Sequence, residues 1–305
     1  MKIVVHGQQA FGKSVLEALI ERGEEIIAVY CAPEKEGQRT DPLKEAALAH
    51  NLPVYQPRSY RNAEVQAEFA ALNADLCVMA YVTLFVPEEV LNAPTHGTIQ
   101  YHPSLLPKHR GPSSINWPII FGAEKTGLTI FWPDNGLDTG PVLLQKEVAI
   151  QDTDTLGSLY FNHLFPMGVE AMLEGVDMVR DGTAPKIVQD EAQATYESWC
   201  RKADVEIDWS KPVQEVWNLI RGSDPQPGAW SPLNGQDIFI YDAKKSTDAS
   251  GQPGEVIGVG ETSFTVAAQG GAIEVVRVRP DGGRKVGAED FIASAGLQTG
   301  ARFGA

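Results

Sequence analysis

Alternation between short apolar runs and amphipathic helical patterns is the feature of this chain that most constrains its fold. The apolar runs are five to seven residues long, which suits strands buried on both faces of a parallel sheet. We expect strands at residues 2–6, 25–31, 76–80, 97–101 and 128–132, and helices at residues 10–21 and 42–50. Strands that alternate with helices form a sheet covered by helices on both faces. The sequence therefore predicts an α/β fold with a Rossmann-like, doubly wound, mostly parallel sheet.

The pattern changes in the second half of the chain. A long helical stretch over residues 156–179 is followed by a polar segment that contains Gly182 and Pro185. A helix at 212–221 then precedes four short β-rich runs separated by Gly and Pro, which is typical of small barrels. We therefore predict an α/β domain over residues 1–182, a linker over 183–206 and a small OB-like β-barrel domain over 207–305.

Charge and cysteine content limit the classes of partner and compartment. The chain has 25 Lys and Arg against 40 Asp and Glu, for a net charge of −15. A broad nucleic-acid groove needs clustered basic residues, so this balance disfavours one. The three cysteines, Cys31, Cys77 and Cys200, lack the spacing of a zinc site, and their number suits a reducing cytoplasm. The first residues enter a strand at once, and no apolar run is long enough to span a membrane, so we expect neither a signal segment nor a membrane partner.

One short motif suggests a nucleotide-binding enzyme. Residues Gly7 to Ser14 match G-x-x-x-x-G-K-[ST], and they lie between a predicted strand and a predicted helix. In a P-loop NTPase, Lys13 would contact phosphates and Ser14 a magnesium ion. Such a site also needs an acid after another strand, and the run that ends at Asp134 is interrupted by Pro133. The alternative interpretation is that Gly7 turns the chain and Gly12 lets the first helix pack on the sheet, and we favour it.

A histidine and an acid from separate segments form the main candidate site. His102 ends a predicted strand and is followed by Pro103, while Asp138 lies in the glycine-flanked loop Gly136-Leu-Asp-Thr-Gly140. Strand alternation places Gln100 on the same face as His102. A His and an Asp brought together can move protons around a carbonyl group. A lone histidine is more often a satisfied core residue, but the polar Gln100 beside it favours a site.

The stretch His102-Pro-Ser-Leu-Leu-Pro-Lys-His-Arg-Gly111, together with Gly136–Gly140, resembles the folate-dependent formyltransferase family. That family includes glycinamide ribonucleotide, methionyl-tRNA and sugar-amine formyltransferases, and the hydrolase domain of 10-formyltetrahydrofolate dehydrogenase, which this sequence resembles most. Further similar stretches are residues 115–117, 130–132, 143–147, 164–166, 182–185, 220–222 and 227–230. Residues 288–291 and 297–300 are similar to the C-terminal barrel of methionyl-tRNA formyltransferases. The resemblance therefore runs through both predicted domains and implies the formyltransferase fold, with residues 1–182 as its catalytic domain.

The resemblance implies an enzyme whose formyl donor is 10-formyltetrahydrofolate and whose chemistry needs no metal. A nucleophile attacks the formyl carbon, His102 takes the family's histidine role at the developing oxyanion, and Asp138 relays the proton. Gln100 stands where the transferases have Asn, so its amide sits one methylene farther out. The loop that holds the pterin ring in the family corresponds here to Leu84, Phe85 and Val86, with Asp138 also near the folate.

The acceptor is left open by the sequence. We expect water or a small amine, with methionyl-tRNA as the main alternative. Transferases of that class present a basic loop after the second strand, whereas residues 33–41 here are mixed in charge. Residues 201–305 carry 11 basic against 14 acidic side chains, so we expect no tRNA partner. The basic triplet Lys108, His109 and Arg110 could meet an anionic acceptor or the glutamate tail of folate, or simply be solvated. A folate-binding protein without chemistry is a third, less favoured interpretation, because His102 and Asp138 are both present.

Overall fold

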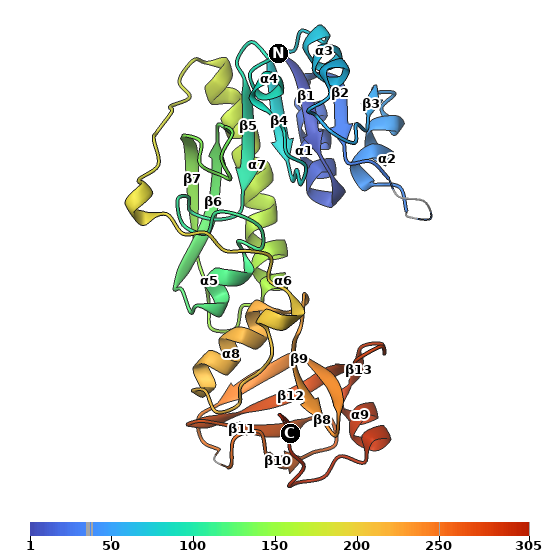
Figure 1. Ribbon diagram of the computed structural model, residues 1–305, viewed down its shortest axis with the longest axis vertical. Helices are drawn as coiled ribbons and strands as arrows, with labels where there is room; N and C mark the ends of the chain where they lie inside the picture. The colour runs from blue at the N-terminus through green and yellow to red at the C-terminus, as the bar shows by residue number, and fades with distance from the viewer. Residues whose placement is uncertain (35–36, 38, 250, 305) are drawn as a thin grey trace. The chain divides into compact units, whose positions relative to one another are not determined.

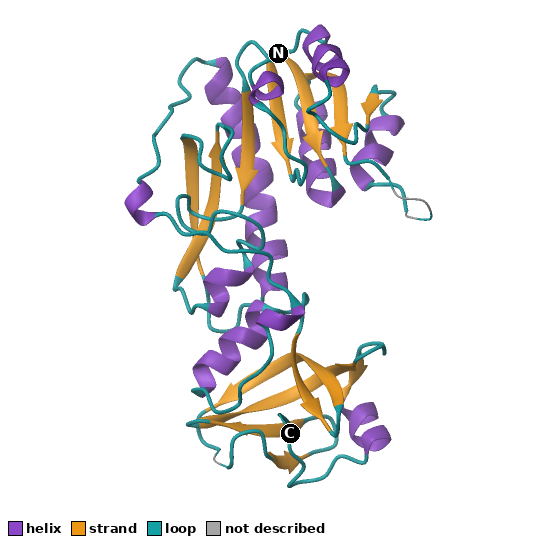
Figure 2. Cartoon of the chain, viewed as in Figure 1, coloured by secondary structure: helices purple, strands orange, loops and turns teal. Residues whose placement is uncertain are grey.

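The computed structural model describes residues 1–34, 37, 39–249 and 251–304, which form two compact units. The first unit comprises Met1–Gly111, Gly127–Val148 and Asn162–Tyr196; the second comprises Pro112–Thr126, Ala149–Phe161 and Glu197–Ala305. Each unit is built around one sheet, drawn in orange in Figure 2. Lys35, Glu36 and Gln38 of the loop expected at 33–41 lie outside the described residues.

The sheet of the first unit has seven strands in the order β3-β2-β1-β4-β5-β6-β7 (Figure 1). They are β1 (Lys2–Gly7), β2 (Glu25–Cys31), β3 (Val54–Tyr55), β4 (Leu76–Ala80), β5 (Thr98–His102), β6 (Lys125–Phe131) and β7 (Val142–Ala149). Strands β1 to β5 pair in parallel, and β6 runs antiparallel to β5. The predicted mostly parallel α/β sheet is therefore confirmed.

Helices cover both faces of this sheet. Buried side chains of α1 (Gln9–Glu21), α2 (Pro42–Ala49) and α7 (Phe165–Arg180) share one core cluster with the strands. The opposite face is packed by α3 (Ala63–Ala71) and α4 (Glu88–Leu91). Such coverage matches the continuous apolar character of β4, all five of whose residues are buried.

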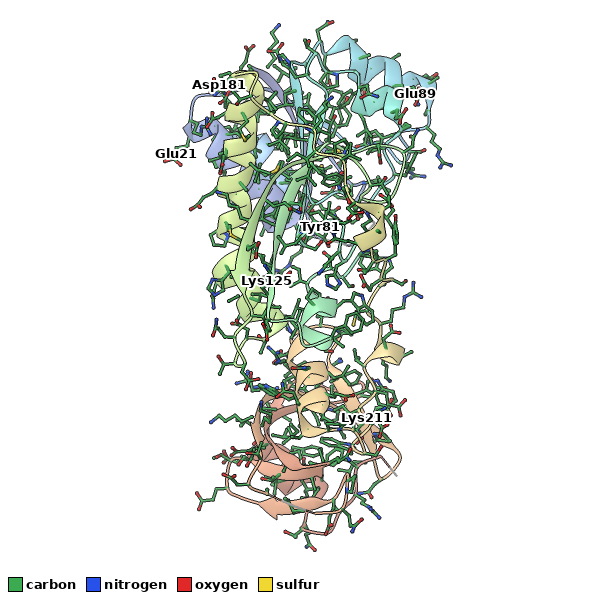
Figure 3. All side chains as sticks on the ribbon, turned by 90° about the vertical axis from the view of Figure 1, so that its left-hand side faces the viewer. Glu21, Tyr81, Glu89, Lys125, Asp181 and Lys211 are labelled. Atoms are coloured by element: carbon green, nitrogen blue, oxygen red, sulfur yellow. The ribbon has the colours of Figure 1, made fainter. Side chains whose placement is uncertain are left out.

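Small residues let α7 approach the sheet closely. A Cβ added at Gly168 would lie 2.7 Å from the Tyr101 ring, and one at Gly175 would lie 3.3 Å from Ile99. Both contacts are with β5, so these glycines fix α7 against the strand that ends at His102. The helix stops at Arg180 and is followed by Asp181, which is labelled in Figure 3.

The second unit contains an antiparallel sheet in the order β10-β11-β12-β9-β8, with β13 paired to β12. Its strands are β8 (Ala229–Leu233), β9 (Gln236–Ser246), β10 (Val256–Val259), β11 (Phe264–Ala268), β12 (Gly271–Pro280) and β13 (Val286–Gly287). Its helices are α5 (Asn116–Ile120), α6 (Leu156–Leu159), α8 (Val213–Gly222) and α9 (Ala288–Ala295). A five-residue π-helix (Tyr160–Leu164) follows α6 along the chain and leads back into the first unit. A 3-10 turn lies at Glu191–Gln193 in the first unit, and another lies at Lys202–Asp204 in the second.

The C-terminal residues connect the two edges of this antiparallel sheet. Phe303 pairs with Leu233 at the end of β8, and Arg302 pairs with Glu255 just before β10. Phe303 also stacks on Phe264 in the core of the unit. The expected β-rich second domain is thus present and its sheet is antiparallel, whereas its closure into an OB-like barrel stays a prediction. Within the part of the chain that the structure describes, no helix is long and apolar enough to cross a membrane.

Candidate active site

His102 lies at the carboxyl end of β5, as the sequence predicted. Pro103 cannot continue the strand ladder, and the Ser104 N–H turns back to donate to the His102 carbonyl over 2.9 Å. The imidazole is buried between two partners from other segments. Its Nε2 lies 2.9 Å from the backbone carbonyl of His109, and its Nδ1 lies 3.6 Å from Oδ2 of Asp138. The structure therefore brings together the two residues that the sequence paired.

The loop that carries Asp138 is folded by its own side chains. Asp134 accepts hydrogen bonds from the Gly136 N–H over 3.0 Å and the Thr139 hydroxyl over 2.6 Å. Asp138 itself adopts the left-handed backbone conformation, with φ of 56°. Its Oδ2 accepts a 2.8 Å hydrogen bond from the Gly111 N–H, which aims the carboxylate at His102.

These contacts decide which nitrogen of His102 can exchange a proton. A carbonyl oxygen only accepts, so the Nε2 that faces the His109 carbonyl carries a hydrogen. Nδ1 is then the atom that gains or loses a proton, and it faces a carboxylate. Its 3.6 Å separation from Asp138 exceeds a direct hydrogen bond, and catalytic contacts are often this long before substrate binds. The pair can therefore handle a proton at Nδ1.

Gln100 lies two residues before His102 on the same strand. In backbone register it stands between Met79 of β4 and Phe131 of β6. The side chain is partly buried, and no hydrogen bond joins its amide to another described residue. An amide without such a bond is available to a ligand. Its role stays a prediction.

The loop after β5, residues 103–111, is called the rim loop here. It is anchored by Arg110, which is fully buried. Its guanidinium donates to Gln189, to both carboxylate oxygens of Glu191 and to the Tyr196 hydroxyl. The bonds from Arg110 lower the pKa of the Glu191 carboxyl, and Glu191 in turn raises the pKa of the guanidinium. Arg110 thus cannot meet an anionic acceptor, contrary to one hypothesis for the basic triplet, whereas Lys108 is exposed.

Sequence reasoning missed Gln189, which lies in the segment expected to be a linker. Its Nε2 donates to the carbonyl of Asp138 over 2.9 Å and to that of Gly140 over 2.7 Å. Nearby, Ile187 exchanges two backbone hydrogen bonds with Val142 at the start of β7. No motif marks Gln189 in the sequence, because its contacts lie 49 and 51 residues away.

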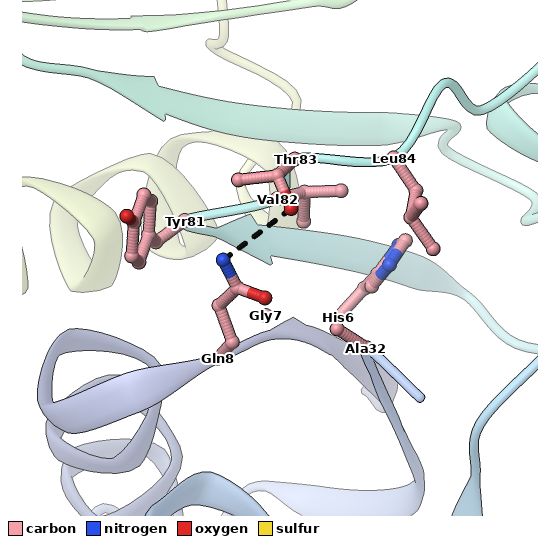
Figure 4. A pocket seen from close by; sticks show the side chains of 8 residues that line it. All are labelled: His6, Gly7, Gln8, Ala32, Tyr81, Val82, Thr83 and Leu84. Carbon is pink, nitrogen blue, oxygen red and sulfur yellow. Dashed lines mark hydrogen bonds between the residues drawn. The ribbon is translucent and has the colours of Figure 1, made fainter. Parts of the chain in front are cut away.

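The loop after β4 forms part of a small pocket (Figure 4). The pocket is lined by His6, Gly7, Gln8, Ala32, Tyr81, Val82, Thr83 and Leu84. Gln8 and Thr83 face each other across it, with 3.4 Å between Nε2 and Oγ1. Of the predicted folate-binding residues, Leu84 lines this pocket, Phe85 is half exposed under the Arg61 guanidinium, and Val86 is buried in the core. Their role toward folate stays a prediction.

His6 is a buried histidine at the base of this pocket. Its Nε2 lies 2.8 Å from the Tyr60 hydroxyl, and its side chain has lost its hydration shell. Desolvation lowers the pKa of His6 to about 3, so the ring is uncharged at neutral pH. A neutral imidazole bonded to a tyrosine is a structural group here, distinct from the His102 pair.

The segment from Gly7 to Ser14 forms the predicted strand, turn and helix but not a phosphate site. The carboxylate of Asp41 accepts two hydrogen bonds from the Gln9 N–H, at 2.9 and 3.0 Å. Lys13 pairs with Glu17 one turn along α1, with 3.7 Å between Nζ and Oε1, and is 44% exposed. An acid therefore occupies the loop where a P-loop would hold phosphate, and the lysine faces solvent.

Across residues 1–34, 37, 39–249 and 251–304, no group of three or more His, Cys, Asp or Glu side chains is arranged to hold a metal ion.

Comparison with known proteins gives the chain its relatives. Residues 1–174 match the formyl transferase model, and residues 200–296 match the formyl transferase C-terminal domain. The chain is 41% identical over 265 residues to mitochondrial 10-formyltetrahydrofolate dehydrogenase of Mus musculus, which covers 85% of this chain and 29% of that protein. It is 35% identical over 309 residues to methionyl-tRNA formyltransferase of Geobacter metallireducens, which covers 100% and 99%. HypX from Aquifex aeolicus, solved in complex with tetrahydrofolic acid, shares the fold at 20% identity, with a TM-score of 0.69 over 96% of this chain and 47% of that one.

Proposed function

The chain belongs to the formyl transferase family, and from this we propose that it is an enzyme that moves the formyl group of 10-formyltetrahydrofolate to a small amine or to water. The observation that carries the proposal is the buried His102–Asp138 pair, whose exchangeable Nδ1 faces a carboxylate. Gln100, two residues earlier on the same strand, has an amide with no hydrogen bond to another residue that the structure describes. The chain spans 29% of the length of the dehydrogenase relative, and the proposal concerns the formyl-group chemistry alone.

The proposed reaction begins when the nucleophile attacks the formyl carbon of the donor. Negative charge then develops on the formyl oxygen, where an N–H donor such as the Gln100 amide stabilises it. The proton of the nucleophile passes to the His102–Asp138 pair and from there to the departing nitrogen of the folate. Burial of both side chains strengthens these charge interactions, because little water screens them.

For the donor, we propose that the pterin ring contacts the loop at Leu84–Val86. This loop follows β4, next to β5 in the sheet, so it lies at the same carboxyl edge as His102. Leu84 and the exposed Phe85 supply apolar surface, and loop N–H and carbonyl groups can read the edge of the ring. HypX, whose fold is similar, was solved with tetrahydrofolic acid.

The decisive experiment is turnover of 10-formyltetrahydrofolate by purified protein, followed by absorbance with no acceptor, with small amines and with methionyl-tRNA. Turnover without acceptor supports water as the nucleophile, and turnover only with an amine supports a transferase. The variants His102→Ala and Asp138→Asn should each lower kcat at least ~100-fold. Full activity in His102→Ala would contradict the mechanism.

Methionyl-tRNA is a second candidate acceptor. One observation favours it, since the Geobacter methionyl-tRNA formyltransferase matches this chain almost from end to end. The acidic charge balance of this chain, with 40 acidic against 25 basic residues, argues the other way. We therefore keep the small amine or water as the primary proposal.

We also propose a cytoplasmic location. The support is that all three cysteines are free thiols, as expected in a reducing compartment. Burial raises the pKa of the Cys31 thiol to about 11 and that of Cys77 to about 12, so these groups stay protonated and unreactive.

A further inference from the structure

The residues on either side of Arg110 hold the two members of the candidate pair. The His109 carbonyl accepts the hydrogen bond from Nε2 of His102, at 2.9 Å. The Gly111 N–H donates to Oδ2 of Asp138, at 2.8 Å. Because residues 109 and 111 are joined through Arg110, the placement of that one residue sets both contacts. A shift of the rim loop would therefore move His102 and Asp138 apart.

Arg110 is fixed by side chains from the segment after α7. All five of its N–H donors have protein acceptors, which are Oε1 of Gln189 (3.1 and 2.8 Å), the Glu191 carboxylate (2.9 and 2.6 Å) and the Tyr196 hydroxyl. The guanidinium also lies over the Tyr196 ring, 5.1 Å from its centre. No donor of Arg110 is left for a substrate, so its contribution is to hold the loop.

Gln189 joins this anchor to the loop of Asp138. Its Oε1 accepts two hydrogen bonds from the Arg110 guanidinium, while its Nε2 donates to the carbonyls of Asp138 and Gly140. The oxygen and the nitrogen of this one buried amide are therefore both hydrogen-bonded. The rim loop beside His102 and the loop that carries Asp138 are both held by the Gln189 side chain.

The backbone conformations of the two loops explain why the hydrogen bonds of Gln189 matter. Asp138 and His109 have φ values of 56° and 57°, in the left-handed region that disfavours residues with a Cβ. Such conformations persist where the surrounding structure enforces them. In the Asp138 loop, the hydrogen bonds from Gln189 to the Asp138 and Gly140 carbonyls are part of these surroundings.

We propose that Gln189 is a positioning residue for the His102–Asp138 pair, acting through the Asp138 and Gly140 carbonyls. The part of this inference that concerns rate rests on the proposed function. The part that concerns loop geometry does not, since it concerns hydrogen bonds that exist without any substrate.

Two variants distinguish the role of the Gln189 N–H donors from that of its Oε1 acceptor. Gln189→Leu removes both, whereas Gln189→Glu keeps an oxygen for Arg110 but loses the N–H groups that hold the two carbonyls. We expect kcat to fall at least tenfold in both variants, with the KM for the folate donor within twofold of wild type. The matched control is Gln193→Leu in the same segment, because Gln193 is exposed and its side chain donates to Asp190 rather than to the site loops. A kcat within twofold of wild type in Gln189→Glu, with a lowered melting temperature, would make Gln189 merely structural and overturn the proposal.

An activity-independent readout is hydrogen exchange of the Gly111 N–H, which donates to Asp138. We expect exchange at Gly111 to be at least tenfold faster in Gln189→Glu and unchanged in Gln193→Leu. If the wild type fails to turn over formyl folate but this acceleration is seen, the proposed function fails and the positioning role stands. If turnover is present but neither kcat nor Gly111 exchange changes in Gln189→Glu, the positioning role fails and the function stands.

Discussion

At the scale of single residues, the candidate site combines side chains whose polar groups are hydrogen-bonded within the protein with one whose amide is available to a ligand. Asp138 and His102 are held by backbone groups of the rim loop, while the amide of Gln100 has no partner among the described residues. A free amide in a partly buried position has lost some hydration without recovering hydrogen bonds. A ligand that hydrogen-bonds to this amide would offset that cost. Gln100 is therefore the residue to test.

Replacing Gln100 by Leu removes the amide at nearly constant volume. We expect kcat to fall about 100-fold, because one oxyanion donor contributes about 10²–10³ in rate. The melting temperature should change little, since the Gln100 amide has no hydrogen bond to another described residue that the change would remove. Gln100→Asn retains a shorter amide and serves as the conservative control, with kcat within about tenfold of wild type. Unchanged kcat in Gln100→Leu, measured by absorbance of the folate, would remove Gln100 from the mechanism.

His6 predicts how stability depends on pH. Its pKa is about 3 in the folded protein and about 6.5 when unfolded, so the unfolded chain binds the proton first as pH falls. Stability is complete above pH 6.5 and is lost as pH falls from 6.5 toward 3. Between pH 7 and 5 we expect the free energy of unfolding of the wild type to drop by about 2 kcal/mol relative to His6→Gln. Urea unfolding at the two pH values measures this difference, with His50→Gln at an exposed position as the control. A pH-independent difference would show that His6 is not buried in its neutral form.

At the scale of elements, the close contact between β1 and β4 depends on Gly7. A Cβ at this position would lie 2.2 Å from the Ala80 carbonyl oxygen, so Gly7→Ala forces the two central strands apart. We expect the free energy of unfolding to fall by at least about 2 kcal/mol. Lys13→Ala, in the same G-x-x-x-x-G-K-S segment, should change it by less than about 0.5 kcal/mol, since Lys13 is exposed. Urea unfolding followed by circular dichroism tests both, and magnesium-dependent ATP binding lost in Lys13→Ala would instead revive the P-loop interpretation.

The elements also show which features the sequence could predict. Strands β2 and β4 have the predicted bounds, because β4 is an uninterrupted apolar run and β2 is apolar after its first residue, Glu25. Strand β7 is predicted only as a stretch similar to the family, since a run of three polar residues, Gln145 to Glu147, interrupts its apolar character. Helix α3 is rich in Ala and Glu and buries only Phe69, so its amphipathic pattern is weak. His102 and Asp138 could be paired from spacing and resemblance, whereas Gln189 could not, because its contacts depend on tertiary structure alone.

At the scale of the whole molecule, charge bears on the choice of acceptor. The net charge of −15 opposes approach of a polyanion, and the 11 basic residues after residue 200 are outnumbered by 14 acidic ones. Several of the basic side chains are also engaged, such as Lys202 with Asp237 and Arg277 with Asp242. A tRNA-specific surface would need these cations to face phosphates.

We therefore expect methionyl-tRNA to bind no tighter than about 10 µM at physiological salt, within the range of non-specific binding. Fluorescence titration at several salt concentrations measures the affinity and its salt dependence. The Geobacter methionyl-tRNA formyltransferase is the matched positive control. Submicromolar binding with a steep salt dependence would favour methionyl-tRNA as the acceptor.

The hydrogen bonds from Gln189 to the Asp138 loop also have a consequence for biosynthesis. Asp138 precedes Gln189 by 51 residues, so a ribosome adding about 5–20 residues per second needs roughly 3–10 s to pass from one to the other. During that interval the nascent chain already contains both members of the pair but lacks the amide that holds their loops. Local synthesis speed across residues 139–189 thus determines how long the unfinished site is presented to chaperones and to solvent before the chain itself completes it.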